Sequence, residues 1–169
     1  SLTLSCPVGL GDGDIAVAAA GSGLKKNTTL RELTLEYAVA TNVSPILTSL
    51  SDHPLLRRLC LRGNGVNLTG LETLLLSDNS KITELDIHSR FYGSSPIIGL
   101  TSVLQALARH PTLTKLRLHR CRLGHDEFRP LRMALRNIPS LESLDLSHNT
   151  LGSVGLADIA PALYHNTSI

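Results

Sequence analysis

A short frame of aliphatic residues recurs along the chain and constrains its fold more than any other feature. The frame L-x-x-L-x-L occurs in copies that begin at Leu30, Leu56, Ile82, Leu113 and Leu141. Ile169 opens a further copy, and Leu2 and Leu4 fit the remains of an earlier one. Successive copies from residue 30 to residue 169 are therefore 26, 26, 31, 28 and 28 residues apart. A period kept along a whole chain predicts a repeat architecture in which each unit packs against its neighbours.

Each repeat divides into a strand half and a helical half. The alternating x-L-x-L part predicts a short strand whose leucines point into a core shared with the rest of the repeat. A polar turn follows, in which Asn64 and Asn149 share a position with Cys121. A buried Asn at such a turn can bond backbone groups of neighbouring coils, and Cys can substitute as a small, weak donor. The pattern predicts parallel strands that alternate with helices.

Serine and proline indicate where several helices begin. Ser44-Pro45 and Ser95-Pro96 place a capping hydroxyl before a proline at the first helical position. Pro130 is expected to open the next-to-last helix in the same way. Because proline breaks a helix interior, Pro161 predicts a short last helix that starts near Asp158.

One position, three residues before each frame, is rich in Asn and His. Its occupants are Asn27, His53, Asn79, His110, Ile138 and Asn166. Since Asn tolerates the left-handed conformation that ends many helices, we expect that conformation here and a structural role for both histidines. The N-x-[ST] sequons at Asn27, Asn42, Asn67 and Asn166 are weak indications of glycosylation, because two of them occupy this turn position.

The composition excludes several classes of protein. Hydrophobic residues make up 42% of the chain but aromatic residues only 3%, so the core must be aliphatic. A net charge of +2 is too small for a nucleic-acid-binding surface, and no apolar run reaches the roughly 18 residues of a membrane span. The odd number of cysteines, at Cys6, Cys60 and Cys121, favours a reducing, cytoplasmic setting. No motif indicates a cofactor.

Two segments carry a resemblance to a known family. "LESLDLSHNTLGSVGLADIAPALYHNTS" and "LTKLRLHRCRLGHDEFRPLRMALRNIPS" resemble the leucine-rich repeat family, most closely its ribonuclease-inhibitor-like subclass. That resemblance implies an α/β solenoid, a horseshoe segment with a parallel β-sheet on its concave face and short helices on its convex face. Residues 1–169 are expected to form one repeat domain, with partial repeats at 1–29 and at 169, cut from a longer array. Members of the family include inhibitors, cytosolic innate immune receptors and scaffolds, so the resemblance implies a non-enzymatic module that binds a protein partner.

The outward strand positions are the candidate binding residues. Read along rows of neighbouring strands, two rows alternate in charge, which favours ion pairs between strands. The same positions can present a binding face, with Tyr37, Arg117 and Arg120 as possible anchors. The candidate residues are Glu32, Thr34, Glu36, Tyr37, Arg58, Arg62, Glu84, Asp86, His88, Lys115, Arg117, His119, Arg120, Asp145 and His148.

Catalytic alternatives have less support. His88, His119 and His148 lie near one edge of the predicted sheet, with Asp86 nearby, where a metal or acid–base site is conceivable. Parallel strands would arrange the rings in a row rather than a tetrahedral cage, so no metal site is expected. The other alternative is a regulator that accelerates GTP hydrolysis in trans, as in Ran GTPase-activating proteins, through the loop-edge residues Arg90, Arg120 and Arg122. The chain is expected to be monomeric, apart from end-to-end association of uncapped repeats.

Overall fold

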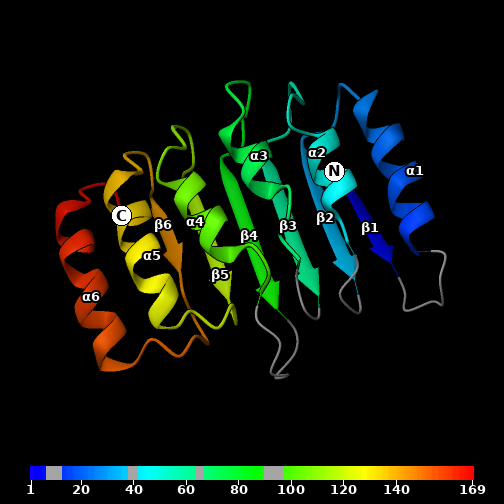
Figure 1. Ribbon diagram of the computed structural model, residues 1–169. Helices are drawn as coiled ribbons and strands as arrows, with labels where there is room; N and C mark the ends of the chain where they lie inside the picture. Colours follow the sequence, from blue (N-terminus) through cyan, green and yellow to red (C-terminus); the bar gives the residue numbers. More distant parts are fainter. Residues whose placement is uncertain (7–12, 38–41, 64–66, 90–96) are drawn as a thin grey trace.

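Six strands alternate with six helices in the computed structural model, which describes residues 1–6, 13–37, 42–63, 67–89 and 97–169 (Figure 1). The strands are β1 (Leu2–Cys6), β2 (Glu32–Tyr37), β3 (Arg58–Gly63), β4 (Glu84–Ser89), β5 (Lys115–His119) and β6 (Ser143–Asp145). The helices are α1 (Gly13–Lys25), α2 (Ser44–Ser49), α3 (Leu71–Leu76), α4 (Leu100–Leu107), α5 (His125–Asn137) and α6 (Gly152–His165). This strict alternation confirms the predicted strand–helix repeat.

All six strands form one parallel sheet in chain order, from β1 to β6. The middle leucine of each frame pairs with that of the next, along Leu33, Leu59, Leu85, Leu116 and Leu144. Leu2 pairs with Leu33 in the same register, which confirms that Leu2 and Leu4 belong to an earlier copy of the frame. The register never slips, although the spacing between copies varies.

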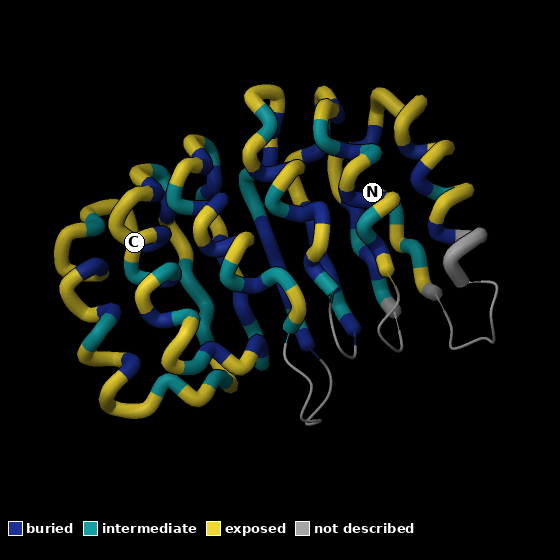
Figure 2. Tube along the Cα trace, in the orientation of Figure 1, coloured by how far each residue is buried: buried dark blue, intermediate teal, exposed yellow. Residues whose placement is uncertain are grey.

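All the helices cover one side of the sheet, and the core lies between the two layers (Figures 1 and 2). Leu33, Leu59, Leu85 and Leu116 are each at most 1% exposed. Burial of one such side chain stabilises the fold by about 1.5–3 kcal/mol. Neighbouring strands lie about 4.8 Å apart and packed helices about 8–10 Å apart, so the helical layer takes the outer arc. These spacings favour a concave sheet side.

The turn after the strand uses its polar residue as predicted. Asn149 Nδ2 donates to the carbonyls of Leu118 and Leu146, at 2.6 and 2.8 Å, and its Oδ1 accepts from Leu123 N–H at 3.2 Å. Cys121, one repeat earlier, is buried and donates its thiol proton to Ile87 O at 3.3 Å. These bonds connect successive repeats. Asn64 lies outside the described residues.

The helix boundaries differ from three of the sequence predictions. Pro130 and Pro161 lie inside α5 and α6 rather than near their starts. Each proline removes a bond to the carbonyl four residues earlier, at Asp126 and Ala157, and both of those residues are exposed to water. Ser44 is the first residue of α2 rather than its cap, which is Val43. The segment Ser95-Pro96 lies outside the described residues.

The Asn and His position before each frame is structural, but it is not left-handed. Asn166 has φ −84° and ψ 112°, and Ile138 has φ −89° and ψ 100°. Three side chains at this position accept an N–H group from the start of the next frame: Asn27 Oδ1 from Leu30 at 2.8 Å, His53 Nδ1 from Leu56 at 3.1 Å and Asn166 Oδ1 from Ile169 at 3.2 Å. His110 instead places its Nε2 3.2 Å from Ser80 Oγ. Hydrogen bonding, rather than tolerance of positive φ, is what these Asn and His side chains share.

Candidate binding surface on the sheet face

The strand register places the candidate residues side by side on the sheet side opposite the helices, which we call the sheet face. One row runs through Glu32, Arg58, Glu84 and Lys115, and a second through Cys60, Asp86, Arg117 and Asp145. Thr34 pairs with Cys60 at the start of the second row. A third row runs through Glu36, Arg62, His88 and His119. The register confirms these three predicted rows across the strands that carry them.

Ion pairs connect the rows from strand to strand. Glu84 accepts from Lys115 Nζ at 2.8 Å and lies 3.6 Å from Arg58 Nε. Arg117 Nε lies 2.9 Å from Asp145 Oδ2. The predicted alternation of charge therefore produces real contacts between neighbouring strands.

Asp86 is the centre of the network. It is only 7% exposed, and its Oδ2 lies 3.6 Å from Arg62 Nη2 and 3.7 Å from Arg117 Nη1. The Cys60 thiol also donates to Oδ2, at 3.6 Å. Arg62 reaches further to Glu36, at 3.8 Å. The carboxylate is thus held between two cations rather than presented to a partner.

These contacts form a neutral charge lattice. Its cations are Arg58, Arg62, Lys115 and Arg117, and its carboxylates are Glu36, Glu84, Asp86 and Asp145. A shallow pocket of about 240 Å³ opens between its members on β3 to β6. Arg58, Lys115 and Arg117 remain exposed although they are paired. Their outer atoms are available to another molecule.

Three histidines continue the surface beyond the lattice. The ring centroids of His88 and His119 are 4.3 Å apart, and those of His119 and His148 are 4.6 Å apart. His119 Nδ1 also lies 2.9 Å from Ser147 Oγ. His148 has a left-handed backbone, with φ 58°, and comes one frame position later than the other two. The predicted histidine row is confirmed.

The environments of His88 and His119 favour the neutral form of each ring. Burial lowers the pKa of His88, and the neighbouring His119 lowers it further. Burial also lowers the pKa of His119, followed by the effect of His148. Among the residues that the structure describes, no group of three or more His, Cys, Asp or Glu side chains is arranged to hold a metal ion.

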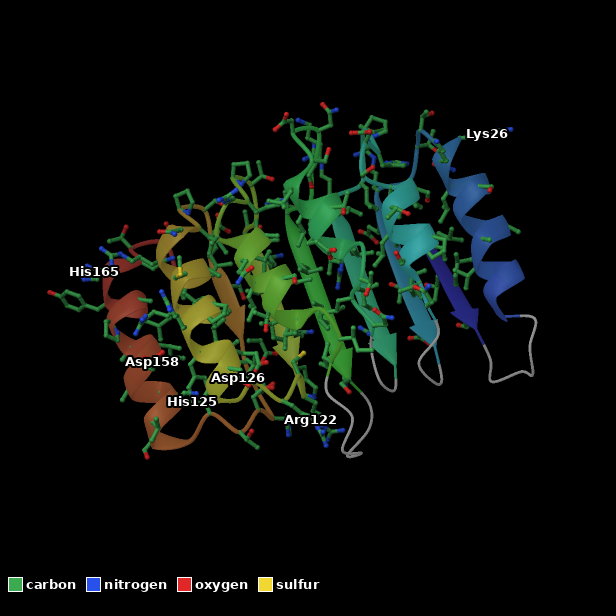
Figure 3. The ribbon with its side chains drawn as sticks, in the orientation of Figure 1. Lys26, Arg122, His125, Asp126, Asp158 and His165 are labelled. Carbon is green, nitrogen blue, oxygen red and sulfur yellow. The ribbon has the colours of Figure 1, made fainter. Side chains whose placement is uncertain are left out.

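The structure describes the remaining candidate residues only in part. Arg120 and Arg122 follow β5, and both have φ 54°, a conformation that few residues with a Cβ adopt. Figure 3 shows Arg122 at the edge of the array where β5 ends. The side chain of Tyr37 and all of Arg90 lie outside the described part of the chain.

The thiols of Cys60 and Cys121 are not placed to act as nucleophiles. Burial raises the pKa of Cys60, and the nearby Asp86 carboxylate raises it further. Burial strongly raises the pKa of Cys121 as well. Both cysteines are free and buried. A thiol held in its protonated form is a poor nucleophile, which fits a structural role for both.

Sequence comparisons identify relatives that share the repeat. The family model described as "Leucine Rich repeat" matches residues 137–160. The chain is 39% identical over 92 residues to the human NACHT, LRR and PYD domains-containing protein 12, a match covering 53% of this chain and 8% of that protein. It is 41% identical over 70 residues to the bovine Tonsoku-like protein, covering 41% of this chain and 5% of that protein. The matched region is therefore a small part of either relative.

Solved structures show the same fold at low sequence identity. The tropomodulin C-terminal domain of Caenorhabditis elegans matches with a TM-score of 0.63 at 16% identity, covering 89% of this chain and 92% of that chain. Leiomodin-1 Actin-Binding Site 2 matches with a TM-score of 0.60 at 16% identity, covering 95% and 91%.

The register, the repeated frame and the curved two-layer arrangement define an α/β repeat solenoid with an open sheet face. Together with the match of the repeat model to residues 137–160, these features support a place for the chain in the leucine-rich repeat family. None of the helices in the described residues is long and apolar enough to cross a membrane.

Proposed function

We propose that the chain is a protein-binding module that recognises a protein partner through the sheet face and catalyses no reaction. The charge lattice carries the proposal, because its eight side chains hold one another in place on a continuous parallel sheet. Side chains that are already ordered lose little freedom when a partner binds. Arg58, Lys115 and Arg117 offer exposed cationic groups with fixed positions, and exposed Glu32 offers a carboxylate at one end of the first row.

The candidate residues have unequal roles in this proposal. The exposed members contact the partner, and the half-buried ones, such as Glu84 and Arg62, hold them in position. Asp86 acts through Arg62 and Arg117, because its own carboxylate is buried. The histidine row extends the contact surface with three tilted rings whose nitrogens can donate or accept hydrogen bonds.

Two further observations support a binding role. Leiomodin-1 has the same fold, and the matched part of that protein is named as an actin-binding site. That likeness supports a protein partner for this chain without specifying which one. The free, buried Cys60 and Cys121 fit the reducing, cytoplasmic setting that we propose.

A comparison of two matched variants tests the proposal. Arg58→Ser with Lys115→Ser removes two exposed cations from the sheet face, and Lys26→Ser with Lys81→Ser removes two exposed cations elsewhere. Affinity purification from a cell lysate, quantified by mass spectrometry, is expected to lose specific partners with the first pair only. Equal capture by both variants and the wild type would place binding away from this face. Adding the chain to a panel of small GTPases tests the alternative, since only that function predicts faster GTP hydrolysis.

A further inference from the structure

A groove of about 640 Å³ lies on the helical side of the molecule, opposite the sheet face. Helices α3 and α5 form its two sides, and α4 forms its floor; the three helices lie side by side in Figure 1. Its apolar lining includes Leu76, Ala106, Pro130 and Met133, and its charged lining includes Arg109 and Arg129. The proposal about the sheet face uses none of these residues.

The unequal lengths and surfaces of the helices explain the groove. Helix α3 has 6 residues and α5 has 13, so they span about 9 and 20 Å. Between them, α4 presents Ser102 and Gln105 outward, side chains too small or too polar to fill the space. The short α3 and the polar outer surface of α4 leave a depression beside the longer α5.

Two large apolar side chains face this depression instead of the core. Leu76 and Met133 are each 49% exposed, whereas Leu75 and Leu135 on the same helices are buried. Leu76 is the last residue of α3, and Met133 lies on the outer side of α5. They stand on opposite sides of the groove, where one apolar surface can contact both.

The groove also has an excess of positive charge, because two arginines and one carboxylate line it. Across the described ranges, Arg109 and Arg129 form no ion pair or side-chain hydrogen bond, unlike nearby Arg132, which binds Asp158 Oδ1 at 2.8 Å. The one carboxylate in the lining, Glu72, accepts the N–H of Gly70 at 3.1 Å. An occupant therefore needs apolar side chains flanked by acidic groups to match both features.

We propose that this groove docks a short, acidic, amphipathic helix of a partner protein. The apolar side of that helix would cover Leu76 and Met133, and its carboxylates would pair with Arg109 and Arg129, an arrangement that Arg supports with two parallel hydrogen bonds. An extended peptide is a poorer occupant, because helices line the groove and offer no strand edge for main-chain pairing. The chain then has a second binding surface on the opposite side from the first.

Synthetic helices provide the test. One fluorescein-labelled peptide carries leucines along one side with glutamates beside them, and its twin carries lysines in place of the glutamates. Fluorescence anisotropy at low salt is expected to show binding of the glutamate peptide to the wild-type chain. Arg109→Glu with Arg129→Glu should weaken that binding about tenfold, since two exposed attractions become repulsions. The same variant should bind the lysine peptide more tightly than the wild type does.

Controls separate the groove from general charge effects. Lys25→Glu with Lys26→Glu changes the net charge equally. Lys25 ends α1, and Figure 3 shows Lys26 at the α1 end of the array, away from α4, so this variant should leave both affinities unchanged. Leu76→Asp with Met133→Asp should abolish binding of the glutamate peptide, while an unchanged melting curve shows that the fold is intact. Glutamate-peptide binding that is absent from the wild type, or equal in the groove and control variants, would refute the proposal. So would a dimer, seen by sedimentation, that dissociates with the Asp variant, because the groove would then be occupied by a second copy of the chain.

Discussion

Replacing the two arginines beside Asp86 is expected to destabilise the chain more than replacing Asp86 itself. Arg62→Met with Arg117→Met keeps much of the apolar stems but leaves a 7% exposed carboxylate without a cation. Asp86→Asn keeps the shape of the side chain and leaves two cations that water can still solvate. The arginine variant also removes the contacts of Arg62 with Glu36 and of Arg117 with Asp145. Those carboxylates are 29% and 33% exposed, so water can solvate them, and most of the difference between the variants reports on the buried charge of Asp86.

The structure gives the size of each effect. Removing one side of a fully buried ion pair costs about 3–5 kcal/mol. Arg62 and Arg117 are 36% and 53% exposed, and their nitrogens lie 3.6 and 3.7 Å from Asp86 Oδ2, so water weakens the pairs. We therefore expect the double arginine variant to lose about 2 kcal/mol of unfolding free energy. The loss for Asp86→Asn should be about 0.5–1 kcal/mol.

Urea unfolding followed by circular dichroism measures both values. The midpoints should fall while the slope of free energy against urea stays constant, because the surface exposed on unfolding is the same. Arg58→Met is a suitable control, since its partner Glu84 keeps the closer Lys115. An arginine variant no less stable than Asp86→Asn would refute the asymmetry, and with it the assignment of Asp86 as the buried centre of the lattice.

Three further predictions concern single side chains. Asn149→Ala should cost about 2 kcal/mol in urea unfolding, because it leaves two carbonyls and one N–H without their partner, whereas exposed Asn137→Ala should change little. Burial lowers the pKa of His88 below its ordinary value of 6.5, so the unfolded chain binds more protons below that pH and stability falls on acidification; His88→Gln should reduce this loss between pH 7 and about 5.5. Burial raises the pKa of Cys60 and of Cys121, so iodoacetamide should modify both only after unfolding, as read by peptide mass spectrometry; modification in the native chain would contradict their burial.

Contacts across the sheet can be predicted from the sequence because they depend on positions within the repeated frame. Alternation within each frame decides which residues point outward, and the spacing of frames decides which of them become neighbours. Lys115 and Glu84 are 31 residues apart in sequence, yet their pairing follows directly from the two frame positions. Residues that share a frame position are therefore predictable as contacts.

Contacts between different frame positions are not predictable in this way. Arg62 reaches Asp86 because its long side chain crosses from one row to another, and His148 joins the histidine row because its backbone is left-handed. The surface on the helical side is harder still to predict from the sequence. The length of each helix depends on packing, as with Ile159 and Ala162, which are buried on α6 on either side of Pro161. The groove over α4 follows from those lengths, and no short motif encodes it.

The unbroken strand register has a consequence for how such a chain can change. The repeats that begin at residues 56 and 82 are 26 and 31 residues long, but both feed strands that pair in phase with their neighbours. Differences in repeat length thus fall between the strands, in the helices and connections, and displace no inward leucine of the frame. New surface can accumulate there at little risk to folding, while the sheet face changes only by exchange of one residue for another.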